Sequence, residues 1–216
     1  MRHRKTVKQF IYEQLIRWNV DLIPQKREQL KEIIKTQGIF IRDVTLSSNL
    51  KSDVYYDIKT VVNSEGSVLI GELMFDKIRK LFPNTKSVGG LESGALLIST
   101  AIVFFSNQLR EEGKLNGFFV RKEPKKHGLE KKVEGITKAP LVIVDDVVTT
   151  GQSVIDAMNA LMAEGHSPIG IISVIDREHE RKLEVLKNGT LKFDSLFKHS
   201  EFEDFIRMKK EEQKTI

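Results

Sequence analysis

Two adjacent aspartates, Asp145 and Asp146, follow the apolar run LVIV and precede the turn TTGQS at residues 149–153. Carboxylates accept hydrogen bonds from hydroxyl groups, including those of a sugar. The backbone N–H groups of a Gly/Ser/Thr turn that leads into a helix form a cradle for an anion. Together the two features suit a ribose 5-phosphate. The structural alternative is a strand end with a helix-capping aspartate, which leaves the second aspartate unexplained.

Several other kinds of chemistry are excluded by the sequence. The motifs GxxxxGK[ST] and GxGxxG are absent, so the chain carries neither a Walker P-loop nor a dinucleotide-binding fingerprint. The chain has no cysteine, which excludes disulfides, thiolate metal sites and a cysteine nucleophile. Carboxylates, backbone donors and cations remain as the candidate functional groups.

A second segment, RKEPKKHG at residues 121–128, is strongly basic. Several fixed cations stabilise the charge that develops on a departing pyrophosphate. A histidine such as His127 also donates a proton or a hydrogen bond near neutral pH. The following residues, LEKKVEG, have little apolar content, as expected of a mobile lid. A solvated basic surface loop is the alternative.

These two segments resemble the motifs of a known family. VIVDDVVTTGQS resembles the phosphoribosyl-diphosphate-binding motif of type I phosphoribosyltransferases, and RKEPKKHG resembles the RKxxKxHG loop of the orotate phosphoribosyltransferases. The resemblance implies that the aspartates hold the ribose hydroxyls and that the turn wraps the 5-phosphate. It implies catalytic roles for Lys125, His127 and Asp146. The implied phosphoribosyl-diphosphate-binding residues are Arg121, Lys122, Lys125, His127, Asp145, Asp146, Val147, Val148, Thr149, Thr150, Gly151, Gln152 and Ser153.

Two further matches concern the base. Tyr55 and Tyr56 resemble the paired aromatics of an early family strand that line the orotate pocket, although both rings could instead belong to the core. Arg177 resembles a strand-end arginine that contacts orotate together with the first threonine of the phosphate motif, here Thr149. A planar guanidinium matches a carboxylate in shape and charge. The resemblance therefore implies that Tyr55, Tyr56, Thr149 and Arg177 bind orotate.

The resemblance also implies a function, a cofactor and an assembly. The function is transfer of ribose 5-phosphate from phosphoribosyl diphosphate to orotate in pyrimidine biosynthesis, which gives orotidine 5′-phosphate and pyrophosphate. The cofactor is Mg²⁺, carried mainly on substrate oxygens with no direct protein ligand. The assembly is a homodimer with shared active sites, in which Arg121, Lys125 and His127 act across the interface and Lys122 acts in its own subunit.

Two positions depart from the family pattern. Bacterial members carry lysine at an early turn and in a pyrophosphate-binding loop, where this chain has Ser47 and Ser93. A phosphoribosyltransferase for another nucleobase is therefore an alternative. A transcription regulator with this fold, which would bind nucleic acid through residues 1–36, is another. That segment is short for a helix-turn-helix domain and shows no clear turn signature, so we do not expect a nucleic-acid partner.

Alternating helices and strands must position these groups. Apolar strands are expected at residues 85–90, 117–121, 141–144 and 169–175, with helices at 71–81, 92–112 and 153–163. Helices are also expected at 8–18, 27–35 and 199–213, and strands at 39–44 and 54–62. This pattern predicts an α/β fold with a parallel central sheet and helices on both faces, in which ligands bind at the carboxyl ends of the strands. We expect a phosphoribosyltransferase domain at 37–216 and an N-terminal helical extension, or hood, at 1–36.

The composition agrees with this interpretation. The 216 residues suit one domain with a small appendage, and the net charge of +5 mildly favours anionic partners. There is no apolar run long enough to span a membrane and no signal-peptide pattern at the start. We therefore expect a cytoplasmic protein that makes no membrane contact.

Overall fold

A computed structural model describes residues 22–46, 50–108, 114–123, 131–180, 182 and 191–214. Several predicted features lie outside these residues: the helix at 8–18, the turn residue Ser47, and the lid residues Lys125 and His127. Their structures and roles stay predictions.

The helices and strands follow one another in an order that alternates through most of the chain. They are α2 (Ile23–Ile33), the π-helical turn η1 (Ile34–Gly38), β1 (Ile39–Thr45), β2 (Lys51–Tyr56), α3 (Ile58–Val61), α4 (Ser64–Leu81), β3 (Ser87–Leu91), α5 (Gly94–Asn107), β4 (Asn116–Val120), β5 (Val133–Gly135), β6 (Leu141–Val148), α6 (Gln152–Ala163), β7 (Pro168–Asp176), β8 (Phe193–Lys198), the 3₁₀ helix η3 (His199–Phe202) and α8 (Glu203–Lys214). In the part of the chain that the structure describes, a helix suited to crossing a membrane is absent.

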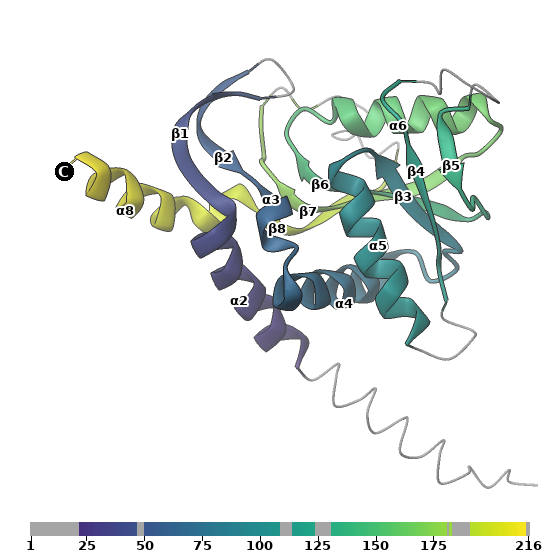
Figure 1. The fold of residues 1–216 in the computed structure, drawn as a ribbon, viewed down its shortest axis with the longest axis horizontal. Helices are drawn as coiled ribbons and strands as arrows, with labels where there is room; N and C mark the ends of the chain where they lie inside the picture. The colour runs from purple at the N-terminus through teal and green to yellow at the C-terminus, as the bar shows by residue number, and fades with distance from the viewer. Residues whose placement is uncertain are drawn as a thin grey trace, which may run out of the picture.

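The central sheet has six strands in the order β5-β4-β3-β6-β7-β8, and β1 pairs with β2 in a separate antiparallel hairpin. Neighbouring strands of the central sheet are parallel, except that β5 runs antiparallel to β4. Helices α4 and α5 cover one face of the sheet and α6 covers the other (Figure 1). The predicted parallel sheet with helices on both faces is confirmed.

Strand β6 divides the core, because alternate side chains of a strand point to opposite faces. Val142 and Val144 are buried in the larger apolar cluster, with α4 and α5. Leu141 and Ile143 are buried in the smaller cluster, with α6. The two aspartates follow these four residues directly in the same strand.

The described part of the N-terminal extension packs onto the sheet domain. Helix α2 lies against α4, and the Leu30 and Ile34 side chains are fully buried in the larger cluster. The Lys26 ammonium also pairs with the Glu72 carboxylate at 2.5 Å. The predicted domain boundary between residues 36 and 37 stays a prediction, although residues 22–36 share the core of the domain that follows.

Two expected boundaries were wrong because short polar side chains cap helices there. The helix expected from residue 71 begins at Ser64, since the Asn63 side chain accepts N–H bonds from the first turn. The strand expected at 54–62 ends at Tyr56, since the Asp57 side chain accepts the Lys59 N–H and starts α3.

The sheet is also more extensive than expected. Strand β6 continues to Val148 rather than ending at Val144, because pairing with β7 continues from Asp145↔Ser173 to Val148↔Asp176. The acidic pair therefore lies within the strand and not after it. Strands β5 and β8 at the two edges were not predicted.

Gly71 allows a close approach between α4 and α5, because a Cβ added there would lie 2.5 Å from the Ala101 carbonyl oxygen. We expect Gly71→Ala to lower the free energy of unfolding by about 1–3 kcal/mol, measured by urea denaturation, because the helices must separate. Gly117→Ala is the matched control, since its added Cβ would meet a Val103 methyl at an ordinary 3.4 Å. Equal denaturation midpoints for the two variants would contradict this packing argument.

Candidate active site

The turn at residues 149–153 connects the end of β6 to the start of α6. Gly151 has a φ of 91°, in the left-handed region that glycine adopts without strain, and it forms the N-cap of the helix. The first N–H groups of a helix have no partner within the helix, and the helix dipole there favours a bound anion. The turn therefore has the form of a phosphate cradle.

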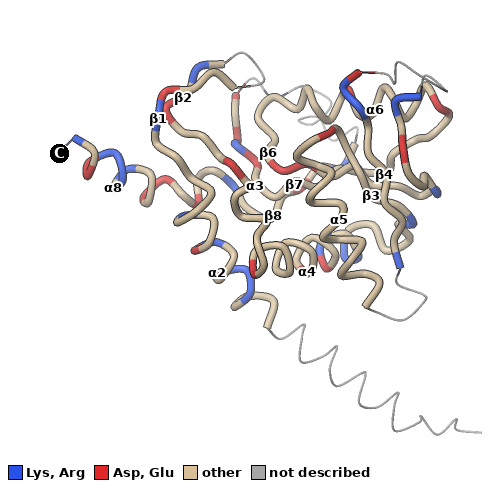
Figure 2. Tube along the Cα trace, viewed as in Figure 1, with Lys and Arg blue, Asp and Glu red and all other residues tan. Residues whose placement is uncertain are grey.

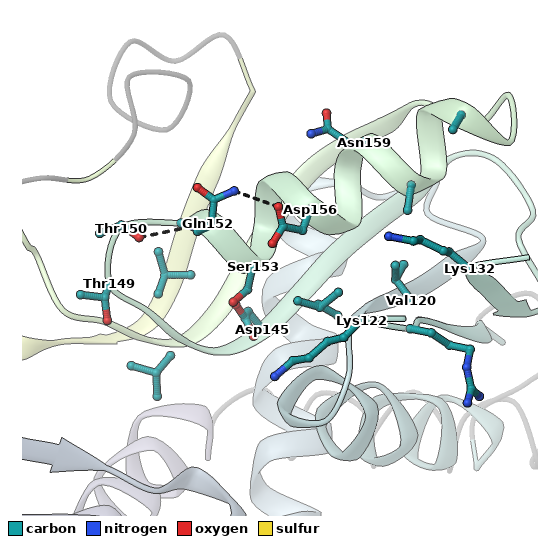
Figure 3. A pocket seen from close by; sticks show the side chains of 17 residues that line it. Val120, Lys122, Lys132, Asp145, Thr149, Thr150, Gln152, Ser153, Asp156 and Asn159 are labelled. Atoms are coloured by element: carbon teal, nitrogen blue, oxygen red, sulfur yellow. Dashed lines mark hydrogen bonds between the residues drawn. The ribbon is translucent and has the colours of Figure 1, made fainter. Parts of the chain in front are cut away.

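A pocket of about 770 Å³ lies over this turn (Figure 3). It is lined by Leu91, Val120, Arg121, Lys122, Lys132, Asp145, Val147, Val148, Thr149, Thr150, Gly151, Gln152, Ser153, Asp156, Asn159, Ala160 and Ala163. The structure thus brings together most of the predicted phosphoribosyl-diphosphate residues within the described part of the chain. Asp146 is the exception, because it is not part of the pocket lining.

The two aspartates differ in their surroundings, although their side chains lie within hydrogen-bonding reach of each other. Asp145 lies on the pocket side and is only 7% exposed, and Figure 3 shows it beside Ser153 at the start of α6. Burial raises the pKa of Asp145 well above its usual value, and the charge of Asp146 raises it further. The Asp146 N–H donates to the Asp145 carboxylate at 3.0 Å, which fixes the orientation of that side chain.

The Asp146 carboxylate lies beside that of Asp145 and against the start of α5. A Cβ added to Gly94 would overlap the Asp146 carboxylate, which would then have to move. The Val147 N–H donates to the Asp146 carboxylate at 2.8 Å, and the nearby helix N-terminus favours a negative charge. Asp146 therefore lies beside the loop that joins β3 to α5.

That loop contains Ser93, which departs from the family pattern, and Glu92 directly before it. The Glu92 carboxylate accepts the backbone N–H of Lys122 at 3.0 Å. The Glu92 N–H in turn donates to the Val120 carbonyl at 2.8 Å. Glu92 is thus bound to the base of the predicted lid, while Ser93 precedes α5 without making a side-chain cap.

The cations of the pocket come from the junction of β4 and β5. The Arg121 guanidinium pairs with Glu134 at 3.1 Å, and the Arg121 backbone N–H donates to the Lys132 carbonyl at 2.9 Å. Figure 3 shows the Lys122 and Lys132 side chains among those that line the pocket. Sequence reasoning did not select Lys132, because only the pairing of the short strand β5 with β4 places it beside Arg121.

The predicted base-binding residues do not all lie together. The Arg177 guanidinium lies 5.4 Å from the centre of the Tyr56 ring, and the Arg177 N–H donates to the Val148 carbonyl at the end of the pocket. Tyr55 lies instead beside Arg42 on the hairpin, with 5.2 Å between guanidinium and ring centre. Neither tyrosine nor Arg177 lines the 770 Å³ pocket. The structure thus brings Tyr56 and Arg177 together at the pocket edge and leaves Tyr55 apart.

The acidic pair, Asp145 and Asp146, supplies carboxylate oxygens that attract a cation to this site. Within the described ranges, no cluster of three or more His, Cys, Asp or Glu side chains is arranged to hold a metal ion. Two carboxylates beside a phosphate cradle fit a Mg²⁺ ion that is held by substrate oxygens and water.

Comparisons with known proteins agree with this geometry. The model of the phosphoribosyl transferase domain family matches residues 69–195. The orotate phosphoribosyltransferase of Rhodopseudomonas palustris (strain TIE-1) is 38% identical over 183 residues, which cover 82% of this chain and 95% of the relative. That of Aquifex aeolicus (strain VF5) is 36% identical, over 82% of this chain and 97% of the relative.

A solved structure of an orotate phosphoribosyltransferase is also similar to this chain. The orotate phosphoribosyltransferase of Mycobacterium tuberculosis H37Rv in complex with 5-phospho-α-D-ribosyl 1-diphosphate superposes with a TM-score of 0.62 at 28% identity. The match covers 81% of this chain and 97% of that protein. With the family match, the fold and the sequence relatives in agreement, this chain belongs to the phosphoribosyltransferase family and is related within it to the orotate phosphoribosyltransferases.

Proposed function

We propose that this chain is an orotate phosphoribosyltransferase, which transfers ribose 5-phosphate from phosphoribosyl diphosphate to orotate in pyrimidine biosynthesis. The observation that carries the proposal is the pocket itself, in which a phosphate cradle and a buried carboxyl lie opposite a pair of lysines. The match to relatives named for this activity covers nearly the full length of those relatives. The expected cytoplasmic location stays a prediction from the sequence.

Each part of the pocket has one task in this reaction. The turn at 149–153 holds the 5-phosphate through its N–H groups, and the acidic pair holds the ribose hydroxyls. As the bond from ribose to pyrophosphate breaks, positive charge develops on the ribose and negative charge on the leaving group. Lys122 stabilises the pyrophosphate in its own subunit, with Arg121, Lys125 and His127 of the second copy in the same role.

Mg²⁺ is the proposed cofactor. Asp145 lines the pocket and Asp146 lies beside it, so the pair would orient a cation carried by the substrate. When bound, the cation neutralises charge on the pyrophosphate and helps to position it.

We propose further that two copies of the chain form a homodimer through α5. This helix contains no charged residue, as its uniform tan trace in Figure 2 shows, and it exposes Leu96, Leu97 and Phe104, the last to 66%. Beside it lies a mostly apolar groove of about 470 Å³ that includes residues 117–119 of β4. Residues 117–119 lie just before the predicted lid in the sequence, which favours this face for a dimer with shared active sites.

Base specificity is tested by a turnover assay with phosphoribosyl diphosphate and Mg²⁺, in which orotate is offered beside uracil, adenine, hypoxanthine and guanine. We expect pyrophosphate release with orotate alone, and loss of that release when Mg²⁺ is chelated. Release with a different base would keep the transfer chemistry and overturn the pyrimidine assignment. No release with any base would contradict the proposed function.

The variant Asp145→Asn should change turnover and stability in opposite directions. Because the folded-state pKa of Asp145 is raised, loss of its proton favours the unfolded state once the pH exceeds the unfolded value of 3.8. The neutral amide should therefore raise the urea midpoint at pH 7.5, with no gain at pH values below about 3.8. Turnover should fall at least about tenfold, because a carboxylate no longer accepts the ribose hydroxyls.

The control for this variant is Asp204→Asn on the exposed surface of α8, where the Asp204 side chain is 88% exposed. It should change neither turnover nor the urea midpoint. Full turnover by Asp145→Asn would leave Asp145 without the proposed role.

Phe104→Glu tests the dimer. A charge at this exposed position would lose water on association, so the variant should be monomeric by light scattering and should lose most of its turnover. Met208→Glu is the control, because Met208 is also exposed, to 54%, but lies on α8. A Phe104→Glu protein that stayed dimeric would place the interface elsewhere.

A further inference from the structure

We propose that His199 is a positioning residue for the base-binding site, which it acts on through Tyr56 and Arg177. This inference rests on the proposed function, because it assigns Arg177 to the base. The three side chains come from separate elements: Tyr56 ends β2, Arg177 follows β7 and His199 begins η3. No local sequence pattern connects them.

The hydrogen bond between Tyr56 and His199 is the first observation. The Tyr56 hydroxyl oxygen lies 2.7 Å from Nδ1 of His199, and the two rings meet edge to face, with centroids 5.9 Å apart. Tyr56 is buried, with 5% exposure, and its ring also meets Phe202 edge to face at 6.0 Å. A buried ring held at its hydroxyl and at its edge has a single orientation.

The protonation states of Tyr56 and His199 determine which of the two donates this hydrogen bond. Burial raises the pKa of the Tyr56 hydroxyl well above its usual value, so the hydroxyl keeps its proton and donates it. Burial lowers the pKa of His199, and the Arg177 charge lowers it further. A neutral His199 therefore accepts at Nδ1 and carries its own proton on Nε2.

Other charged groups also face His199. Glu178 follows Arg177 after β7, and Glu203 and Lys210 lie on α8. Lys210 pairs with Asp53 of β2 at 2.6 Å. The two glutamates raise the pKa of His199 and Lys210 lowers it, but burial and Arg177 are the larger causes, so the neutral form prevails.

The Tyr56 ring in turn supports Arg177. The guanidinium lies over this ring at 5.4 Å, and its Nη2 donates to the Ser52 hydroxyl at 2.9 Å. Ser52 is fixed by the backbone of its own strand, because its hydroxyl accepts the Val54 N–H at 3.1 Å. Two side chains of β2 therefore hold Arg177, and one of them depends on His199.

The backbone beside Arg177 is also constrained from η3. Glu178 has a φ of 52°, in the left-handed region that is strained for residues other than glycine. The Ser200 N–H donates to the Glu178 carboxylate at 2.8 Å, so the residue after His199 holds the residue after Arg177. Strained backbone held in this way is typical of sites that need a fixed geometry.

The test compares His199→Ala, Tyr56→Phe and the double variant by steady-state kinetics with orotate and phosphoribosyl diphosphate. Loss of one hydrogen bond should raise KM for orotate about three- to tenfold in each single variant. The double variant should show no larger increase than either single variant, because both remove the same bond. KM for phosphoribosyl diphosphate should not change. His199→Asn should restore much of the orotate KM, because an amide oxygen can accept near the position of Nδ1.

The matched control is His166→Ala. It removes a similar bond, between His166 Nε2 and Thr137 Oγ1 at 2.9 Å, away from the base site, and should alter neither KM. Urea midpoints are measured for all variants. A lowered midpoint with unchanged orotate KM, additive effects in the double variant, or equal increases in both KM values would overturn the inference.

The proposed function and this inference can fail separately. Normal orotate turnover with an unchanged orotate KM in His199→Ala and Tyr56→Phe would overturn the inference alone. If the wild-type chain used another base, the same comparison would be made with that base and judged by the same outcomes. A wild-type chain that turned over no base would overturn both.

Discussion

The alternation of side chains along β6 is the constraint on which the rest of the site depends. This strand is buried on both faces, so Val142 and Val144 must meet one helical layer while Leu141 and Ile143 meet the other. The two carboxylates that follow lie within hydrogen-bonding reach of each other. Asp145 lines the pocket over α6, and Asp146 lies against the start of α5. The strand therefore delivers two adjacent carboxylates to the same end of the sheet.

This arrangement places a destabilising group within the site. Asp145 is almost fully buried beside a second carboxylate, and both effects oppose its ionisation. Without a ligand, the folded state gains no stability from a carboxylate buried at this position. The surrounding structure makes it tolerable, because β6 is paired with β3 and β7 and packed between two helical layers. Such a balance between stability and function is common where a site must bind charge.

The edge of the pocket is assembled differently from its centre. The central turn and acidic pair come from one continuous segment. The cations come from the junction of β4 and β5, and the Arg177 cluster combines β2, the end of β7 and η3. Elements far apart in the chain therefore determine the side of the pocket where the base is proposed to bind. Small changes at those elements can alter base recognition without altering the phosphate cradle.

The sequence by itself determined the class of fold, the phosphate turn and the acidic pair, because each is encoded in adjacent residues with a clear local pattern. The starts of α4 and α3 were missed, although the capping residues Asn63 and Asp57 mark them locally. Only the tertiary structure decided that Lys132 lines the pocket, that Tyr55 and Tyr56 separate, and that His199 meets Tyr56. Those relations depend on strand pairing and on contacts between residues up to 143 positions apart in the chain, which side-chain periodicity does not encode.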